Sequence, residues 1–258
     1  MIESTFQILP AVGPKKEHAL WDSGITRWSD FLEEESPVGI SPKNKERQDS
    51  VLRYAYELLD SGDCAGLANM LKHGEHWRLY RRFRDNAAYL DIETDGLERD
   101  STVTCLTVHR PDRTVTLVNG RDLTSENLSE ALKDTSVLVT FNGSCFDVPV
   151  LRNSFPDVNL DLPHYDLRFA CRKVGYRGGL KNIEKDIGIV RDDSISEVDG
   201  FEAVRLWKRW DDRGDRDALD TLLMYNVADT VNLERLADVV YDRMVTEYAG
   251  FTGRETDI

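Results

Sequence analysis

The chain has 258 residues, enough for one well-packed domain and a smaller one, because domains commonly run about 100–200 residues. It contains no stretch of about 18 apolar residues, and its N-terminus lacks a basic start followed by an apolar run. We therefore expect a cytoplasmic protein without a membrane segment. The four cysteines form no CxxC pair, so neither a zinc knuckle nor a disulfide framework is indicated.

The formal net charge is −14, with 47 acidic residues against 33 basic ones. An acidic chain that is rich in Asp and poor in Lys is typical of a high-salt cytoplasm. At about 1 M salt the Debye length is about 3 Å, so that only local charges act on a partner. The acidity therefore does not exclude a polyanionic substrate.

Three parts are predicted along the chain. Residues 1–86 form a helical N-terminal region, residues 87–245 an α/β domain, and residues 246–258 a disordered tail. The first boundary lies after the segment WRLYRRFR, where the β-like run AAYLDIE begins.

The segment ILPAVGPKKEHALWDSGITRWSDFL near the N-terminus resembles a helix-hairpin-helix, a motif whose hairpin presents backbone N–H groups to a DNA phosphate. Gly13, Lys15 and Lys16 stand where that motif needs them, and the resemblance implies that they contact DNA. Ala11 stands where the usual pattern has its first glycine. The alternative is a small helical scaffold held by apolar residues such as Trp28.

Residues 48–84 are predicted as further helices that end in a run of alternating basic and aromatic residues. Arg78, Arg81 and Arg82 lie in this run and are candidates for nucleic-acid binding, because basic residues neutralise phosphates and aromatic rings stack on bases. The alternative is an amphipathic helix whose aromatic side docks the N-terminal region onto the following domain.

The remaining chain predicts a mixed sheet flanked by helices. Predicted strands are residues 87–93, 102–108 and 114–118, which form an antiparallel meander, then 137–141 and a short strand near Tyr165. Predicted helices begin at Ser125 and after Pro149 and span about 180–187, 199–210 and 215–243. The fold class is therefore α/β, with a small all-α N-terminal domain.

The first candidate site lies at the end of the strand AAYLDIE. Asp91 and Glu93 are two residues apart and project from the same face of the strand. Two neighbouring carboxylates raise one another's pKa, whereas a divalent cation compensates both. The alternative is an acidic strand end at a solvated rim.

Two further patterns carry acidic residues. In FNGSCFDVP, Asp147 follows a glycine-containing turn after a buried strand, a position where such sheets place ligands, although it also suits the N-cap of the next helix. In YNVADTVNLERL, Tyr225 and Asp229 share one helix face. Metal ligation would explain why an acidic residue, Asp229, lies on that face. The alternatives are a salt bridge from Asp229 to a nearby Arg and a core role for Tyr225.

The order of these patterns, a strand-end DxE, then NGxxFD, then YxxxD in a late helix, resembles the DEDDy subgroup of DEDD 3′→5′ exonucleases. It is more similar still to the YprB-like ribonuclease-H-like family, over about residues 87–243. The resemblance implies a ribonuclease-H-like fold and a site for two divalent metal ions, Mg²⁺ or Mn²⁺, which suit an all-oxygen ligand shell.

Carried over to this chain, the resemblance assigns a role to each residue. Asp91 bridges both ions, Glu93 and Asp229 complete one, Asp147 binds the second, and Tyr225 orients the attacking water. Substrate contacts are implied for Thr94, Leu97, Asn142, Phe146 and Lys181, and a supporting role behind the ligands for Asp166. The alternatives are core positions for the apolar residues, a helix-surface charge for Lys181 and an N-cap for Asp166.

The implied function is metal-dependent 3′→5′ hydrolysis of single-stranded nucleic acid, and the N-terminal segment favours DNA over RNA. Two alternatives stay open. One is a catalytically silent nucleic-acid-binding adaptor with the same fold, and the other is a structure-specific endonuclease with the same metal chemistry. The sequence leaves the oligomeric state open.

Overall fold

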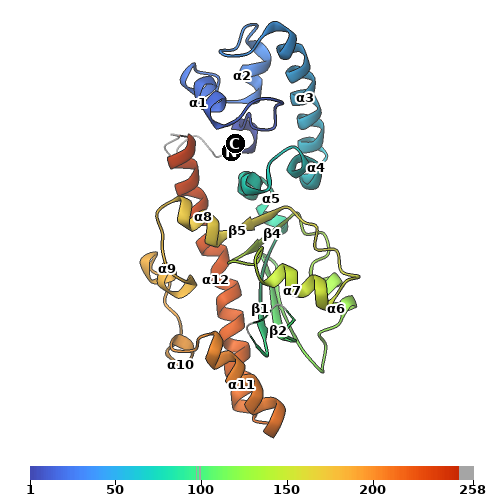
Figure 1. The fold of residues 1–258 in the computed structure, drawn as a ribbon, viewed down its shortest axis with the longest axis vertical. Helices are drawn as coiled ribbons and strands as arrows, with labels where there is room; N and C mark the ends of the chain where they lie inside the picture. Colours follow the sequence, from blue (N-terminus) through green and yellow to red (C-terminus); the bar gives the residue numbers. More distant parts are fainter. Residues whose placement is uncertain (97, 99, 250–258) are drawn as a thin grey trace. The chain divides into compact units, whose positions relative to one another are not determined.

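The protein is represented by a computed structural model that describes residues 1–96, 98 and 100–249 (Figure 1). The chain divides into two compact units. Among the described residues, the first comprises Met1–Arg84 and residues 241–249, and the second lies within Asp85–Val240. The sequence places its boundary between residues 86 and 87.

Among the described residues, the second unit contains one five-stranded sheet in the order β3-β2-β1-β4-β5. The first three strands pair antiparallel, and β4 and β5 continue the sheet in parallel with β1. The strands are β1 (Ala87–Thr94), β2 (Val103–Arg110), β3 (Arg113–Val118), β4 (Val137–Thr140) and β5 (His164–Asp166). The predicted mixed sheet is confirmed.

The parallel strands β1, β4 and β5 end at the same edge of the sheet, because Tyr89 of β1 lies beside Val139 of β4, which in turn lies beside Tyr165 of β5. Loops that follow the carboxyl ends of parallel strands are where open sheets place ligands. This edge carries Glu93 at the end of β1 and Asp166 at the end of β5.

Helices cover both faces of the sheet (Figure 1). They are α6 (Ser125–Ala131), α7 (Asp147–Ser154), α8 (Leu167–Lys173), α9 (Leu180–Asp186), α10 (Asp193–Ser196), α11 (Gly200–Arg213) and α12 (Arg216–Ala249). Leu106 of β2 shares a core cluster with Val150 of α7, whereas its neighbour Cys105 shares one with Leu222 of α12. Because successive strand residues point to opposite faces, the sheet is buried between these two layers.

Three helix predictions need correction. Helix α7 begins at Asp147 and not after Pro149, since proline is tolerated in a first helical turn. Helix α8 was not predicted, because the strand signal near Tyr165 hides it; Asp166 ends that strand and caps α8 by accepting the Arg168 N–H at 3.1 Å. The short helix α10 was not predicted either.

The first unit is helical, as predicted. Its elements are η1 (Ile2–Ser4), α1 (Pro14–Asp22), α2 (Trp28–Glu33), α3 (Pro42–Asp60), α4 (Cys64–Asn69), η2 (His73–Leu79) and α5 (Tyr80–Phe83), after which η3 (Arg84–Asn86) leads into β1. Its core includes Leu20, Trp28, Phe31 and Leu52, all fully buried. In the part of the chain that the structure describes, no helix is long and apolar enough to cross a membrane.

The predicted tail begins within a helix. Helix α12 continues to Ala249, so residues 246–249 are helical, and the rest of the predicted tail lies outside the described residues. The Tyr248 ring lies 6.2 Å from the Trp77 ring, between centroids, so aromatic packing within the first unit holds this last turn.

Arg78, a candidate for nucleic-acid binding, is instead 1% exposed inside the first unit. Its guanidinium contacts Glu75 at 2.8 Å and the buried Glu17 at 3.1 Å. Glu17 also accepts hydrogen bonds from the Thr5 hydroxyl and the Phe6 N–H. A buried carboxylate needs such a partner, because an unpaired charge in the core is costly.

We expect Arg78→Met to destabilise the first unit by about 3–5 kcal/mol, because it leaves Glu17 charged and buried without its cation. Urea denaturation followed by tryptophan fluorescence would measure this change. Arg82→Met is the matched control, since Arg82 is exposed, and its midpoint should stay near that of the unaltered protein. Equal midpoints for the two variants would contradict a structural role for Arg78.

Candidate active site

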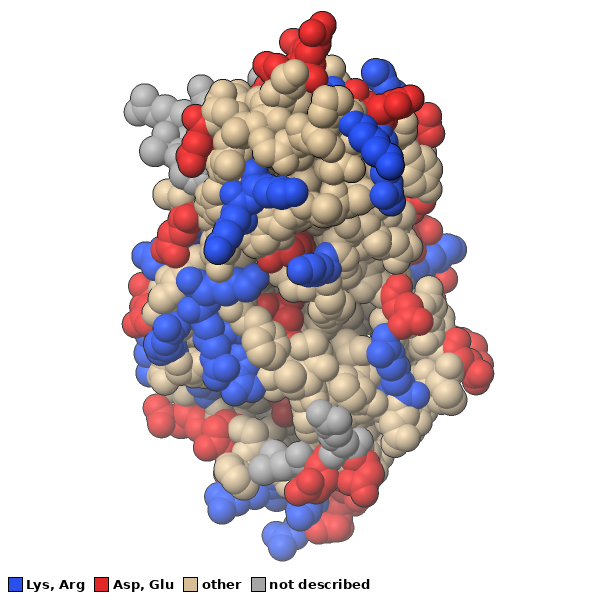
Figure 2. Space-filling view, turned by 45° about the horizontal axis from the view of Figure 1, so that its top comes forward, with Lys and Arg blue, Asp and Glu red and all other residues tan. Residues whose placement is uncertain are grey.

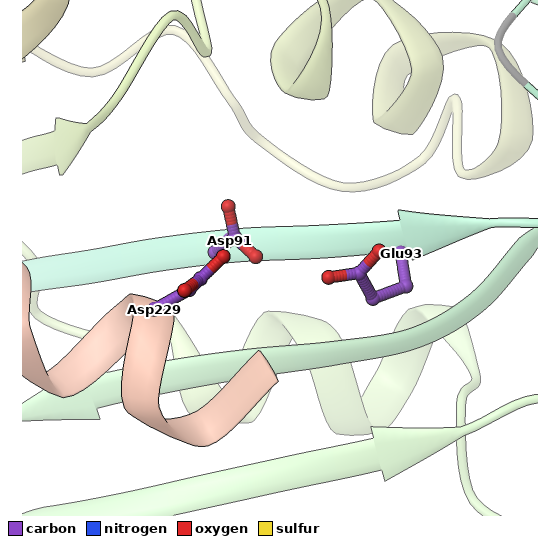
Figure 3. Close-up of side chains that lie close together, drawn as sticks. All are labelled: Asp91, Glu93 and Asp229. Atoms are coloured by element: carbon purple, nitrogen blue, oxygen red, sulfur yellow. The ribbon is translucent and has the colours of Figure 1, made fainter. Parts of the chain in front are cut away.

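Three carboxylates from two elements meet beside the sheet. Asp91 and Glu93 come from β1 and Asp229 from α12, and one oxygen of each lies within 4.8 Å of the others (Figure 3). Asp91 and Glu93 share a face because they are two residues apart on a strand, and this face is turned toward α12. The cluster is therefore built by one strand and one helix that are far apart in the sequence.

Asp147 completes the set of acids from a third element, the start of α7. Its Oδ1 accepts the N–H of Ile92, between the two β1 acids, at a distance of 3.3 Å. Asp147 lines the same cavity as the three clustered acids, a space of about 650 Å³. Asn142, Phe146 and Tyr225 line it as well, so seven of the predicted site residues surround one cavity.

The acids are removed from solvent, with exposed fractions of 5–9% for Glu93, Asp147 and Asp229. Burial, reinforced by the neighbouring carboxylates, raises the pKa of Asp91 and of Glu93 well above the usual range. Burial also raises the pKa of Asp147, to about 7, against hydrogen bonds from backbone N–H groups that lower it. Such a cluster of acids strongly favours a cation.

The donor set fits a hard divalent ion. Carboxylate oxygens are the ligands that Mg²⁺ and Mn²⁺ prefer, and three of them converge here from Asp91, Glu93 and Asp229. Burial, and after it the neighbouring carboxylates, raises the pKa of Asp91 and of Glu93, and a bound cation would compensate the charge of the ionised acids.

Tyr225 lies one helical turn before Asp229 on α12, and its hydroxyl donates a hydrogen bond to the Asp229 carboxylate. The side chain is 8% exposed and faces the cavity. Burial and the nearby carboxylates raise the pKa of Tyr225, so the phenol stays protonated at neutral pH. It is placed to hold a polar group beside the acids.

Arg191 was not predicted as a site residue. Its guanidinium forms an ion pair with Asp229 and a two-bond pair with Glu184, at 2.6 and 2.8 Å. Asn232 donates to the same Glu184 at 3.0 Å. The salt bridge weighed as an alternative for Asp229 is therefore present, and it supplies one positive charge against four acids.

Asn226 is a second residue that sequence reasoning missed. It is fully buried on α12, and its Nδ2 donates to Asp91 Oδ2 at 2.8 Å. This bond fixes the orientation of the Asp91 carboxylate. The signal was a polar residue on the buried face of a helix, next to Tyr225. Arg191 gave no such signal, because it lies in the connection between α9 and α10.

Asp166 organises the loop after β4. Its carboxylate accepts the N–H groups of Asn142 at 2.8 Å and Ser144 at 3.0 Å, and it also caps α8. The N-cap weighed from the sequence is present, and the supporting role of Asp166 behind the metal ligands stays a prediction. Asn142 has a φ of 72°, a left-handed conformation that these hydrogen bonds stabilise.

The other predicted substrate contacts differ in position. The Lys181 ammonium donates to the backbone carbonyls of Ser196, at 3.0 Å, and Val198, and Lys181 is not among the described residues that line the cavity. Thr94 is buried and its hydroxyl donates to the Gly96 carbonyl. Leu97 lies outside the described residues.

The structure also describes the residues of the first unit that are predicted to contact nucleic acid. Gly13 precedes α1 as its N-cap, and Lys15 and Lys16 are exposed. Ala11 has a φ of 62°, so the chain adopts the left-handed conformation at the position where the motif expects glycine. Arg81 pairs with Asp242 and stacks on the Tyr241 ring at 5.0 Å, so its charge is partly compensated.

Comparison with known proteins places this geometry in context. The model of the RNase_H superfamily matches residues 88–241, which is more than half of the chain. No curated protein matches the sequence.

The solved structures that are similar to the chain include the following two. The family B DNA polymerase from the hyperthermophilic archaeon Pyrobaculum calidifontis is 17% identical with a TM-score of 0.52, over 63% of this chain and 25% of the polymerase. Escherichia coli RNase D, an exoribonuclease involved in structured RNA processing, is 17% identical with a TM-score of 0.42, over 68% of this chain and 45% of its own. The chain thus spans less than half of either protein, and the likeness to the polymerase concerns the fold.

Proposed function

The chain belongs to the RNase_H superfamily, and we propose that it is a metal-dependent nuclease of the DEDDy type that removes nucleotides from the 3′ end of a single strand. The observation that carries this proposal is the cavity lined by Asp91, Glu93, Asp147, Asp229 and Tyr225 together. The order of these residues in the sequence supports the YprB-like family as the nearest group.

The four acids would hold two divalent ions, Mg²⁺ or Mn²⁺, with Asp91 shared between them. Glu93 and Asp229 would complete one site and Asp147 the other, as the resemblance implies. Bound there, the ions supply Lewis acidity and stabilise the attacking and leaving oxygens of an in-line phosphoryl displacement.

The protein's own groups position the reactants. The protonated Tyr225 hydroxyl, now bonded to Asp229, orients the attacking water, and Asn226 keeps the Asp91 carboxylate in register. Asn142 and Phe146 contact the terminal nucleotide from the loop that Asp166 holds. For Thr94 and Leu97, the resemblance implies contact with the same nucleotide.

Lys181 and Arg191 act behind the substrate in this proposal. Lys181 anchors the segment before α11 through backbone carbonyls, and its ammonium lies 5.1 Å from the centroid of the Tyr225 ring. Arg191 pairs with Asp229 and so compensates part of the negative charge of the acids. Both therefore support the position of Tyr225 and Asp229.

DNA is the favoured substrate, because the N-terminal segment with Gly13, Lys15 and Lys16 resembles a helix-hairpin-helix. The polymerase that shares the fold acts on DNA by its name, which is in keeping with this preference. A cytoplasm of high salt, suggested by the net charge of −14, is the setting we propose for the reaction.

The test is the product pattern from 5′-labelled single strands of DNA and RNA, with free or blocked 3′ ends, in Mn²⁺ and at several salt concentrations. We expect a ladder that shortens one nucleotide at a time from a free 3′ end, and faster with DNA. Internal cuts in the blocked strand would favour the endonuclease alternative. Binding without cleavage under every condition would favour the silent adaptor.

A further inference from the structure

One wall of the acidic cavity carries positive charge. Arg168 and Arg172 line this cavity together with the acids, and they lie one turn apart on α8. Side chains four residues apart on a helix lie on the same face, so both arginines border the same space.

No carboxylate neutralises the charge of these arginines among the described residues. Among the described residues, neither Arg168 nor Arg172 forms an ion pair with an Asp or Glu. Arg168 instead donates to the neutral Asn142 Oδ1 at 2.6 Å, a bond that orients the guanidinium while leaving its charge available. Arg172 is exposed.

Two glycines on the same cavity have no conformational need to be glycine. Gly179 and Gly200 avoid positive φ, and a Cβ added to either would meet nothing within 4 Å. Gly178, by contrast, has a φ of 98° and suits only a residue without a Cβ. Gly179 is the N-cap of α9, a position where glycine is a preferred residue, and Gly200 at the start of α11 leaves open space that a ligand can approach closely.

We propose that Arg168 and Arg172, which line the cavity together with Gly179 and Gly200, bind the phosphates of a single strand leading to the acids. This inference rests on the proposed function. Local positive charge favours the approach of a polyanion to a cluster of four acids in a chain of net charge −14. Figure 2 shows Lys and Arg side chains gathered on part of one face of the molecule despite this excess of acids.

The ligand class is a nucleic-acid strand and not free phosphate. Phe169, the residue after Arg168 on α8, is 43% exposed and is not among the described residues that line the cavity, so its ring offers a stacking surface for a base of the strand outside the cavity. Two arginines on one helix face also suit successive phosphates, because each guanidinium can bind one phosphate by two hydrogen bonds.

The first experiment measures binding of a fluorescent single-stranded DNA to the full chain carrying Asp91→Asn, which blocks cleavage, by anisotropy across a salt series. Adding Arg172→Gln should weaken binding about tenfold and reduce the slope of log affinity against log salt by about one. Arg205→Gln is the matched control, because it removes the same charge from a side chain that is 75% exposed and outside the cavity. Equal affinities for the two variants would overturn the inference.

The second experiment tests whether this side of the cavity binds the ligand or serves only the stability of the fold. Gly200 is the first residue of α11, where alanine is favourable, so Gly200→Ala should keep or raise the melting temperature. The same change should weaken strand binding several-fold, because the new methyl group enters the space of the ligand. Normal strand binding by this variant would contradict the proposed strand-binding site.

The two proposals fail in different ways. If the unaltered chain cleaves DNA while Arg168→Gln and Arg172→Gln variants bind and cleave normally, this inference is wrong and the nuclease stands. If the unaltered chain does not cleave DNA, but binding falls in those variants and not in Arg205→Gln, the strand-binding site stands and the proposed nuclease activity is wrong. Competition by inorganic phosphate at micromolar concentration would show a site for free phosphate. It would overturn the inference that the ligand is a nucleic-acid strand.

Discussion

Replacing Asp91 by Asn is expected to lower nuclease activity by about 10³-fold or more, which corresponds to about 4 kcal/mol of lost transition-state stabilisation. Asp91 lies in the cluster with Glu93 and Asp229, and its carboxylate is fixed by Asn226. Asparagine has nearly the same shape, so the fold should persist while one negative charge is lost. Initial rates of nucleotide release from a labelled strand measure the effect.

Two further variants define the specificity of this result. Asp112→Asn is the control, because Asp112 is exposed in the turn between β2 and β3, and it should retain full activity. Tyr225→Phe removes only the hydroxyl bonded to Asp229 and should cost about 10²-fold. Activity of Asp91→Asn within twofold of the unaltered protein would refute a catalytic role for the cluster.

The metal-free protein is expected to lose stability as the pH rises from 5 to 8. Folding raises the pKa of four acids, Asp91, Glu93, Asp147 and Asp229. Between the unfolded and the folded pKa of each group, the folded protein therefore binds more protons than the unfolded chain. Stability therefore falls as pH rises through that window. For Asp147 the window runs from 3.8 to about 7, worth up to about 4 kcal/mol.

Thermal unfolding in EDTA at several pH values, repeated with Mn²⁺, measures this loss. We expect the melting temperature to fall with rising pH in EDTA and to recover with Mn²⁺, because a bound cation compensates the ionised acids. Asp147→Asn should flatten the decline, since that residue no longer titrates. A melting temperature that rises from pH 5 to pH 8 in EDTA would contradict the electrostatic picture of the cavity.

The fold followed from local patterns in the sequence. Apolar runs bounded by turn residues predicted all five strands, and the alternation of strand side chains predicted that Asp91 and Glu93 share a face. Helical periodicity predicted that Tyr225 and Asp229 face the same side. These are short-range regularities, and the side chains they concern come to line one cavity.

Pairings between distant residues were not accessible in this way. The alternation of basic and aromatic residues around Arg78 suggested an exposed basic face, but Glu17, far away in the sequence, pairs with it in the core. Arg191 reaches Asp229 from an irregular connection that has no periodicity to interpret. Backbone carbonyls that no sequence pattern reveals hold the Lys181 ammonium, and its contact with substrate stays a prediction.

The central claim is that the acidic cavity is a metal-dependent catalytic site, and its most direct test is cleavage as a function of divalent ion. The full chain is treated with EDTA, dialysed, and mixed with a 5′-labelled single strand while Mn²⁺ or Mg²⁺ is added in steps. We predict no nucleotide release without the ion, and release that rises and saturates as the ion is added. Equal release in EDTA and in Mn²⁺ would contradict the claim.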